Sequence, residues 1–243
     1  MDKKMFLFRP TFYIGFVAYF ILGFMTLAFG ERVASAMYPE DHYFENVGAI
    51  SLFIASGICL YIFIFARRTR KTTGMFWVKQ FVYLGLALLF FFGGGEEISW
   101  GQRIFNIAEP QALAQQNTQD ELNIHNLGIF ENSKLLKADN IFSVFWFGFA
   151  VVLPVLSLLY GRFKKFFSKL TPIPYWGMGA LFLFNYIWAG LSKIIYASNY
   201  TYQEIPFVQA VQEVKESNYE LLFIPLAIFL LWDLNRMVRE NTG

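Results

Sequence analysis

The chain has 243 residues, of which 56% are hydrophobic and 20% aromatic, whereas only 16% are charged. Soluble domains average about 45–50% apolar and about 25% charged residues, so this composition excludes an ordinary soluble domain and indicates a polytopic membrane protein. The net charge of +2 gives no indication of a nucleic-acid partner. We therefore expect an all-α membrane helix bundle, with one integral membrane domain over residues 1–243.

Six segments are apolar enough to cross a membrane, which takes roughly 20 residues per helix. In chain order they are residues 11–34, 46–66, 76–97, 141–160, 175–196 and 217–232. The last is short unless the polar residues before it also enter the membrane. The first is longer than the roughly 7–15 apolar residues of a signal peptide, so we expect a retained signal-anchor helix. Cleavage near Ala34-Ser35-Ala36 is the alternative.

Lys and Arg predict the orientation of the six spans. Fourteen of the 20 fall on one side, in clusters within residues 3–9, 67–79, 162–169 and 236–239. Cytoplasmic loops carry such an excess, so both termini of this multi-pass protein are predicted to be cytoplasmic. Fifteen of the 18 acids and both histidines fall on the other side, which includes a loop at about 98–140. These acids form either a solvated surface or a site.

The first acidic segment, residues 38–46, precedes the second span. Asp41 and Glu45 are four residues apart and share one face if the helix has already begun. Asp41 could instead cap that helix. A cap does not account for Glu45, which lies where the apolar run starts.

The second segment, GGGEEISWGQR, ends the third span. If the helix continues through it, one side carries Glu96, Ser99, Trp100 and Arg103, flanked by Glu97 and Gln102. The three glycines permit a close helix approach or a local break. Ionisable residues at membrane depth usually face the interior of a bundle. The alternative is that the two acids only mark the end of the span, with Glu96 paired to Arg103.

Two further segments carry regularly spaced polar residues. Over residues 117–126 an extended chain would place alternate polar side chains on one edge, although a hydrophilic loop has the same composition. These are Asn117, Gln119, Glu121, Asn123 and His125, followed by a turn at Asn126. Before the sixth span, acids spaced for one helix face indicate either a site or a solvated amphipathic helix. They are Glu213, Glu216 and Glu220, preceded by Gln209.

Three of these motifs together resemble an uncharacterised family of bacterial integral membrane proteins. They are Glu40-Asp41…Glu45-Asn46, Gly95-Glu96-Glu97-Ile98-Ser99-Trp100-Gly101-Gln102-Arg103, and Asn117…Gln119…Glu121…Asn123…His125-Asn126. The resemblance covers most of the chain and implies a multi-pass protein of the bacterial cytoplasmic (inner) membrane. A similarity in layout alone links the chain to alkaline-ceramidase-like membrane hydrolases, although two histidines cannot form a three-histidine zinc site.

The polar residues predict a carboxylate and histidine site at the membrane boundary. Its expected catalytic residues are Glu96, Glu97 and His125. Its expected substrate-binding residues are Ser99, Trp100, Gln102, Arg103, Asn123 and Asn126. Its expected metal ligands are Asp41, Glu45, Glu97 and His125, for Ca²⁺, Mg²⁺, Mn²⁺ or Zn²⁺.

We expect the site to belong to a hydrolase or transferase that acts on a membrane lipid or a lipid-linked head group. One alternative is a non-catalytic assembly subunit that binds a membrane protein partner. The other is a cation- or proton-coupled transporter, since intramembrane carboxylates also bind cations and relay protons.

Overall fold

The structure is a computed structural model that describes residues 5–39, 42–102, 105 and 138–242. All regular elements in these ranges are helical. Six helical segments are long and apolar enough to cross a membrane, which confirms the predicted all-α bundle. They are Pro10–Ala28, Tyr43–Thr73, Trp77–Glu97, Asn140–Leu159, Trp176–Ile195 and Phe207–Thr242.

The spans are built from these elements. The first is α1 (Pro10–Met25), extended by η2 (Thr26–Ala28), and the next two are α3 (Tyr43–Thr73) and α4 (Trp77–Glu97). The fourth joins α7 (Ala138–Trp146), a π-helical segment η5 (Phe147–Val152) and α8 (Leu153–Leu159). The last two are α10 (Trp176–Ile195) and α11 (Phe207–Thr242). Shorter helices are η1 (Phe6–Phe8), α2 (Glu31–Met37), η3 (Ser99–Gly101) and α9 (Gly161–Leu170).

The sixth span is much longer than its apolar run. We predicted residues 217–232, but α11 is one helix of 36 residues that includes the polar approach and continues through the buried Pro225. At 1.5 Å per residue, this helix is about 54 Å long, well beyond a bilayer core of about 30 Å. Its acidic stripe therefore belongs to the same rigid rod as its apolar half.

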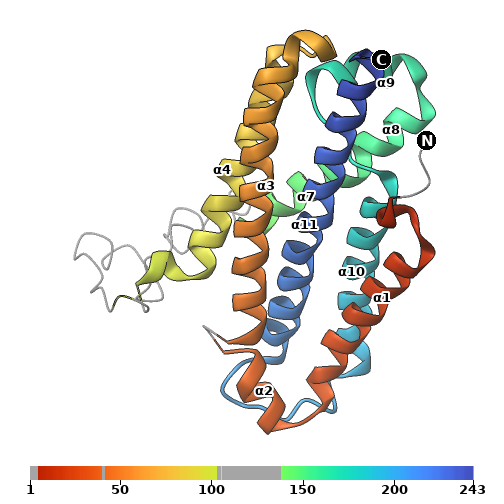
Figure 1. Ribbon diagram of the computed structural model, residues 1–243. Coiled ribbons are helices and arrows are strands. Elements are labelled where there is room, and N and C mark those ends of the chain that lie inside the picture. The colour runs from red at the N-terminus through yellow and green to blue at the C-terminus, as the bar shows by residue number, and fades with distance from the viewer. Residues whose placement is uncertain (1–4, 40–41, 103–104, 106–137, 243) are drawn as a thin grey trace.

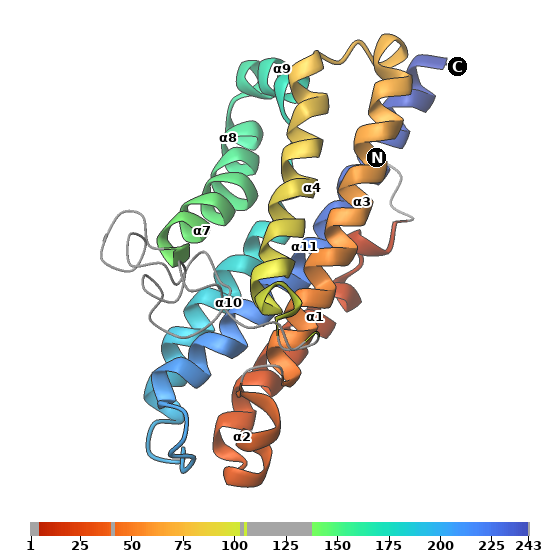
Figure 2. The ribbon, with the colours of Figure 1, turned by 90° about the vertical axis from the view of Figure 1, so that its left-hand side faces the viewer.

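The two longest helices, α3 and α11, form the centre of the bundle. Both pack along each other, while α4 lies along α3 and α10 lies along α11 (Figure 1, Figure 2). One end of the bundle carries α2 and the connection between α10 and α11, and the opposite end carries α9 and the C-terminal turns of α11. We refer to these as the α2 end and the α9 end.

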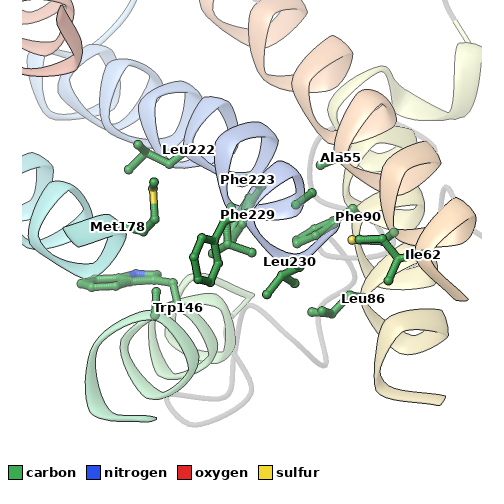
Figure 3. Close-up of a cluster of buried hydrophobic side chains, with 14 of the residues drawn as sticks. Ala55, Ile62, Leu86, Phe90, Trp146, Met178, Leu222, Phe223, Phe229 and Leu230 are labelled. Carbon is green, nitrogen blue, oxygen red and sulfur yellow. The ribbon is translucent and has the colours of Figure 1, made fainter. Parts of the chain in front are cut away.

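Apolar side chains from α3, α4, α7, α10 and α11 fill the middle of the bundle (Figure 3). The rings of Phe90 and Phe223 are 4.6 Å apart between centroids. Trp146 stacks on Tyr219 at 5.1 Å. Because a bilayer gives helices no hydrophobic drive to associate, such close packing holds the bundle together.

Of the two alternatives that the glycine triplet allowed, a close helix approach or a local break, the structure has the close approach. An added Cβ would lie 3.2 Å from Leu52 at Gly93 and 3.1 Å from the Phe53 ring at Gly94. Both contacted side chains belong to α3, so the missing side chains let α4 lie close to it. The helix is not broken within the triplet and ends at Glu97.

At the α9 end, a buried lysine joins three elements. Lys79 of α4 is only 1% exposed. Its Nζ donates to the Ser168 carbonyl at 2.9 Å and lies 3.8 Å from the Met237 sulfur. The amphipathic α9 is thereby tied to α4 and to the end of α11.

Candidate carboxylate site

Two carboxyl groups from different helices meet in the half of the bundle nearer the α2 end. Glu97 is the last residue of α4, and Glu220 lies within α11. Their side chains are hydrogen-bonded to each other. The Oε2 atom of Glu220 is buried and has no hydrogen-bond partner among the described residues. Two carboxyl groups can share a hydrogen bond only if one of them carries a proton, because an ionised carboxylate has no donor.

A glycine on a third helix makes room for this pair. Glu220 is only 6% exposed, and its carboxyl group lies against Gly48 of α3. A Cβ atom at position 48 would overlap Oε2 of Glu220. The absence of a side chain at Gly48 therefore decides where the Glu220 carboxyl group can lie.

Further acids surround the pair. Glu45 and Glu216 interact electrostatically with both Glu97 and Glu220, and Glu213 does so with Glu220. These charges raise the energy of an ionised pair, because like charges repel strongly at low dielectric. Glu45, Glu213 and Glu216 also make other contacts, so none of them is free.

The pair lies inside the bundle and not at its rim. Glu220 is thirteen residues from Asp233, which is about 20 Å along α11. It is six residues, about 9 Å, deeper than Val214, whose side chain would contact a Cβ at Gly23 near the α2 end of α1. Glu220 is the fourteenth of the 36 residues of α11, and the expected location of the acids at the membrane boundary stays a prediction.

An amide pair lies at nearly the same depth, because Asn218 is only two residues before Glu220 on α11. Asn218 Nδ2 donates to Asn185 Oδ1 at 2.9 Å, and Asn185 Nδ2 donates to the Lys215 carbonyl at 2.8 Å. Both asparagines are fully buried. Asn185 is at the middle of the 20-residue α10. The polar layer between α10 and α11 therefore reaches the middle of the bundle.

Glu96 and Glu97 point to different partners. Trp100 Nε1 donates to Glu96 Oε1 at 2.5 Å, and Glu96 has a further contact of its own. We expected Glu96, Ser99 and Trp100 on one face of a continuing helix. That expectation is wrong, because Ser99 and Trp100 have positive φ angles of 46° and 52° and form a separate 3-10 turn. The turn folds the indole back onto Glu96.

Five of the predicted site residues lie in the parts of the chain that the structure does not describe. Asp41, Arg103, Asn123, His125 and Asn126 lie outside the described residues, so their expected roles stay predictions. Of the predicted residues that are described, Glu45 lies near Glu97, Ser99 is buried in the turn, and Gln102 follows it.

Two residues of this site were not predicted. Gly48 and Asn218 carry no signal of their own in the sequence, since a glycine or an asparagine in an apolar helix has many uses. Their positions could have singled them out. Gly48 lies three residues after Glu45, and Asn218 lies two residues before Glu220, so each is less than one helical turn from a predicted acid.

The described part of the chain gives no support to the predicted metal centre. No group of three or more His, Cys, Asp or Glu in the described ranges is arranged to hold a metal ion. Two of the four predicted ligands, Asp41 and His125, lie outside those ranges. The predicted metal centre therefore stays a prediction.

Comparison of the chain with protein families, curated proteins and solved structures gave no match.

Proposed function

We propose that this integral membrane protein is a hydrolase or transferase in which Glu97 and Glu220 form an acid and base pair inside the bilayer. The observation that carries the proposal is the hydrogen bond between the two carboxyl groups, enclosed by α3, α4 and α11. Paired carboxyl groups that share a proton can divide the roles of general acid and general base between them.

The pair can supply both proton transfers that a hydrolysis or transfer step needs. The ionised carboxylate removes the proton from an attacking water or hydroxyl oxygen as that oxygen bonds to the reacting centre. The protonated carboxyl group gives its proton to the oxygen that leaves. Each step of this kind typically contributes about 10²- to 10⁴-fold in rate.

The surroundings favour an enzyme over a transporter. Between the pair and the α9 end, the core is filled by apolar side chains that include Phe90, Phe223, Leu86 and Leu230 (Figure 3). A route for ions or protons across the bundle needs polar groups along its length. Chemistry confined to the α2 end needs no such route.

The position of the pair also favours a membrane substrate. Glu220 lies about 9 Å deeper than Val214, within a bundle whose outer surface is apolar. A lipid or lipid-linked head group can reach this depth from the side without leaving the bilayer. We propose the head-group region of such a molecule as the reacting part.

The test is conversion of lipid by the purified protein. The protein is incubated in vesicles of a total bacterial lipid extract, and every lipid class is followed by mass spectrometry. We expect one class to be converted by the wild type, and Glu97→Gln and Glu220→Gln each to lower the rate by about 10²- to 10⁴-fold. The matched control is Glu240→Gln, which changes an exposed acid at the far end of α11.

The control variant is expected to convert lipid at the wild-type rate. If the wild type leaves all lipid classes unchanged, or if either variant of the pair keeps the full rate, the enzyme proposal is wrong.

A further inference from the structure

A groove with two lysines opens between α10 and α11 near the α2 end. Its volume is about 260 Å³. Its wall is formed by Ile187 and Ala189 of α10 and Val211 of α11, and its polar lining includes Tyr186, Lys193 and Lys215. Nothing lies within 4 Å of where a Cβ at Gly190 would be, so the groove is open at that point.

The groove faces outward from the bundle. Tyr186 is 60% exposed and Ile187 is 58% exposed. Both lie on α10, a span whose outward surface meets the acyl chains of a bilayer. An apolar wall on this surface therefore fits an acyl chain better than it fits a water-soluble molecule.

The two lysines line the groove at different depths, Lys193 toward the α2 end and Lys215 beside the middle of α10, where its backbone carbonyl accepts from Asn185. Lys193 is two residues from the end of α10 and forms no ion pair with any described residue. Lys215 Nζ is 3.9 Å from a carboxylate oxygen of Glu216, with both side chains part-exposed. Lysine ammonium groups near the ends of spans reach toward the polar interface, and two of them beside one groove favour an anion.

We propose that this groove binds an anionic membrane lipid, with its phosphate between Lys193 and Lys215 and an acyl chain along the apolar wall. The charge of the phosphate complements the two ammonium groups. A free phosphate ion would use the lysines but not the wall, and so would bind more weakly.

The groove is also connected to the carboxyl pair. Glu216 contacts two residues of the groove, since Gln212 Nε2 donates to its Oε1 at 2.9 Å and Lys215 Nζ lies 3.9 Å from the same atom. Glu216 in turn interacts with both Glu97 and Glu220. A phosphate held by the lysines is therefore next to Glu216, which lies one turn of α11 before Glu220. On the proposed function, this identifies the substrate as a phosphate-bearing lipid.

The binding test is separate from turnover. A photoreactive benzoylphenylalanine replaces Ile187, in the Glu220→Gln background so that bound lipid is not consumed. Cross-linking to phosphatidic acid is measured in phosphatidylcholine vesicles that contain a minor fraction of phosphatidic acid. We expect cross-linking to favour phosphatidic acid over its share of the lipid, and Lys193→Gln with Lys215→Gln to reduce this preference on the order of tenfold.

Two controls make the result specific. Lys164→Gln with Lys165→Gln removes the same charge from exposed lysines of α9, and we expect it to leave the preference unchanged. Added inorganic phosphate is expected not to compete; full competition would show that the site takes a free anion and not a lipid.

If cross-linking shows no preference for phosphatidic acid, or if the lysine variants keep it, the groove proposal is wrong whatever the turnover result. If the preference depends on the lysines but the wild type converts no lipid, the groove proposal stands and the enzyme proposal fails.

Discussion

At the scale of single residues, the site depends on Gly48, which has no side chain to fill the space beside Glu220. Gly48 leaves the space that the Glu220 carboxyl group occupies, and in that position Glu220 is hydrogen-bonded to Glu97. The same helix contains Gly57, where an added Cβ would meet nothing within 4 Å. Substitutions at Gly48 and Gly57 can therefore be compared, to separate the effect of the contact with Glu220 from the general effect of glycine in a helix.

We predict that Gly48→Ala lowers the free energy of unfolding by about 1–3 kcal/mol, because the new methyl group overlaps a buried carboxyl group. Gly57→Ala is predicted to raise it by about 0.5–1 kcal/mol, since alanine loses less backbone entropy in a helix. Both are measured by unfolding of the purified protein in detergent micelles. Equal effects of the two changes would show that Gly48 has no special role.

At the scale of elements, α10 is joined to α11 by a short chain of buried amides. Asn218 donates to Asn185, and Asn185 donates to the backbone carbonyl of Lys215. The Asn218 Oδ1 atom has no partner in the described part of the chain. The two asparagines therefore act as one unit, and losing either leaves polar atoms of the other unpaired.

We predict that Asn185→Leu and Asn218→Leu each lower the free energy of unfolding by about 1 kcal/mol, which is the usual size of an interhelical hydrogen bond in a membrane. The double variant should cost less than the sum of the two, because it leaves no amide without its partner. Unfolding in mixed micelles measures all three. Strict additivity would mean that the two amides do not interact.

At the scale of the whole molecule, six spans place both ends of the described chain on the same side. The excess of Lys and Arg toward that side predicts that it is cytoplasmic. The α2 end, with the carboxyl pair and the lysine groove, would then face the periplasm.

We predict that a cysteine at Asn199, in the exposed connection between α10 and α11, reacts with an impermeant thiol reagent in intact cells. A cysteine at Thr72, exposed near the end of α3, should react only after the membrane is opened. The native Cys59 is buried and provides no background. Labelling of Thr72→Cys in intact cells would reverse the orientation and place the site on the cytoplasmic side.

The sequence by itself determined the number of spans and the helical fold. Both follow from runs of about 20 apolar residues, which are a local property of the chain. It also singled out Glu45, Glu97 and Glu220, and it allowed either close packing or a break at the glycine triplet. Helix ends were less predictable: the break after Glu97 and the extension of α11 through its polar residues depend on contacts beyond the local pattern.

Only the tertiary structure decided which acids meet. Glu96 and Glu97 are neighbours in the sequence, yet one binds Trp100 and the other binds Glu220, 123 residues further along the chain. The rotation and register of α4 against α3 and α11 set this choice, and they result from side-chain packing among three helices. The spacing of residues along one helix shows which side chains share a face. It does not show which residues of another helix pack against that face.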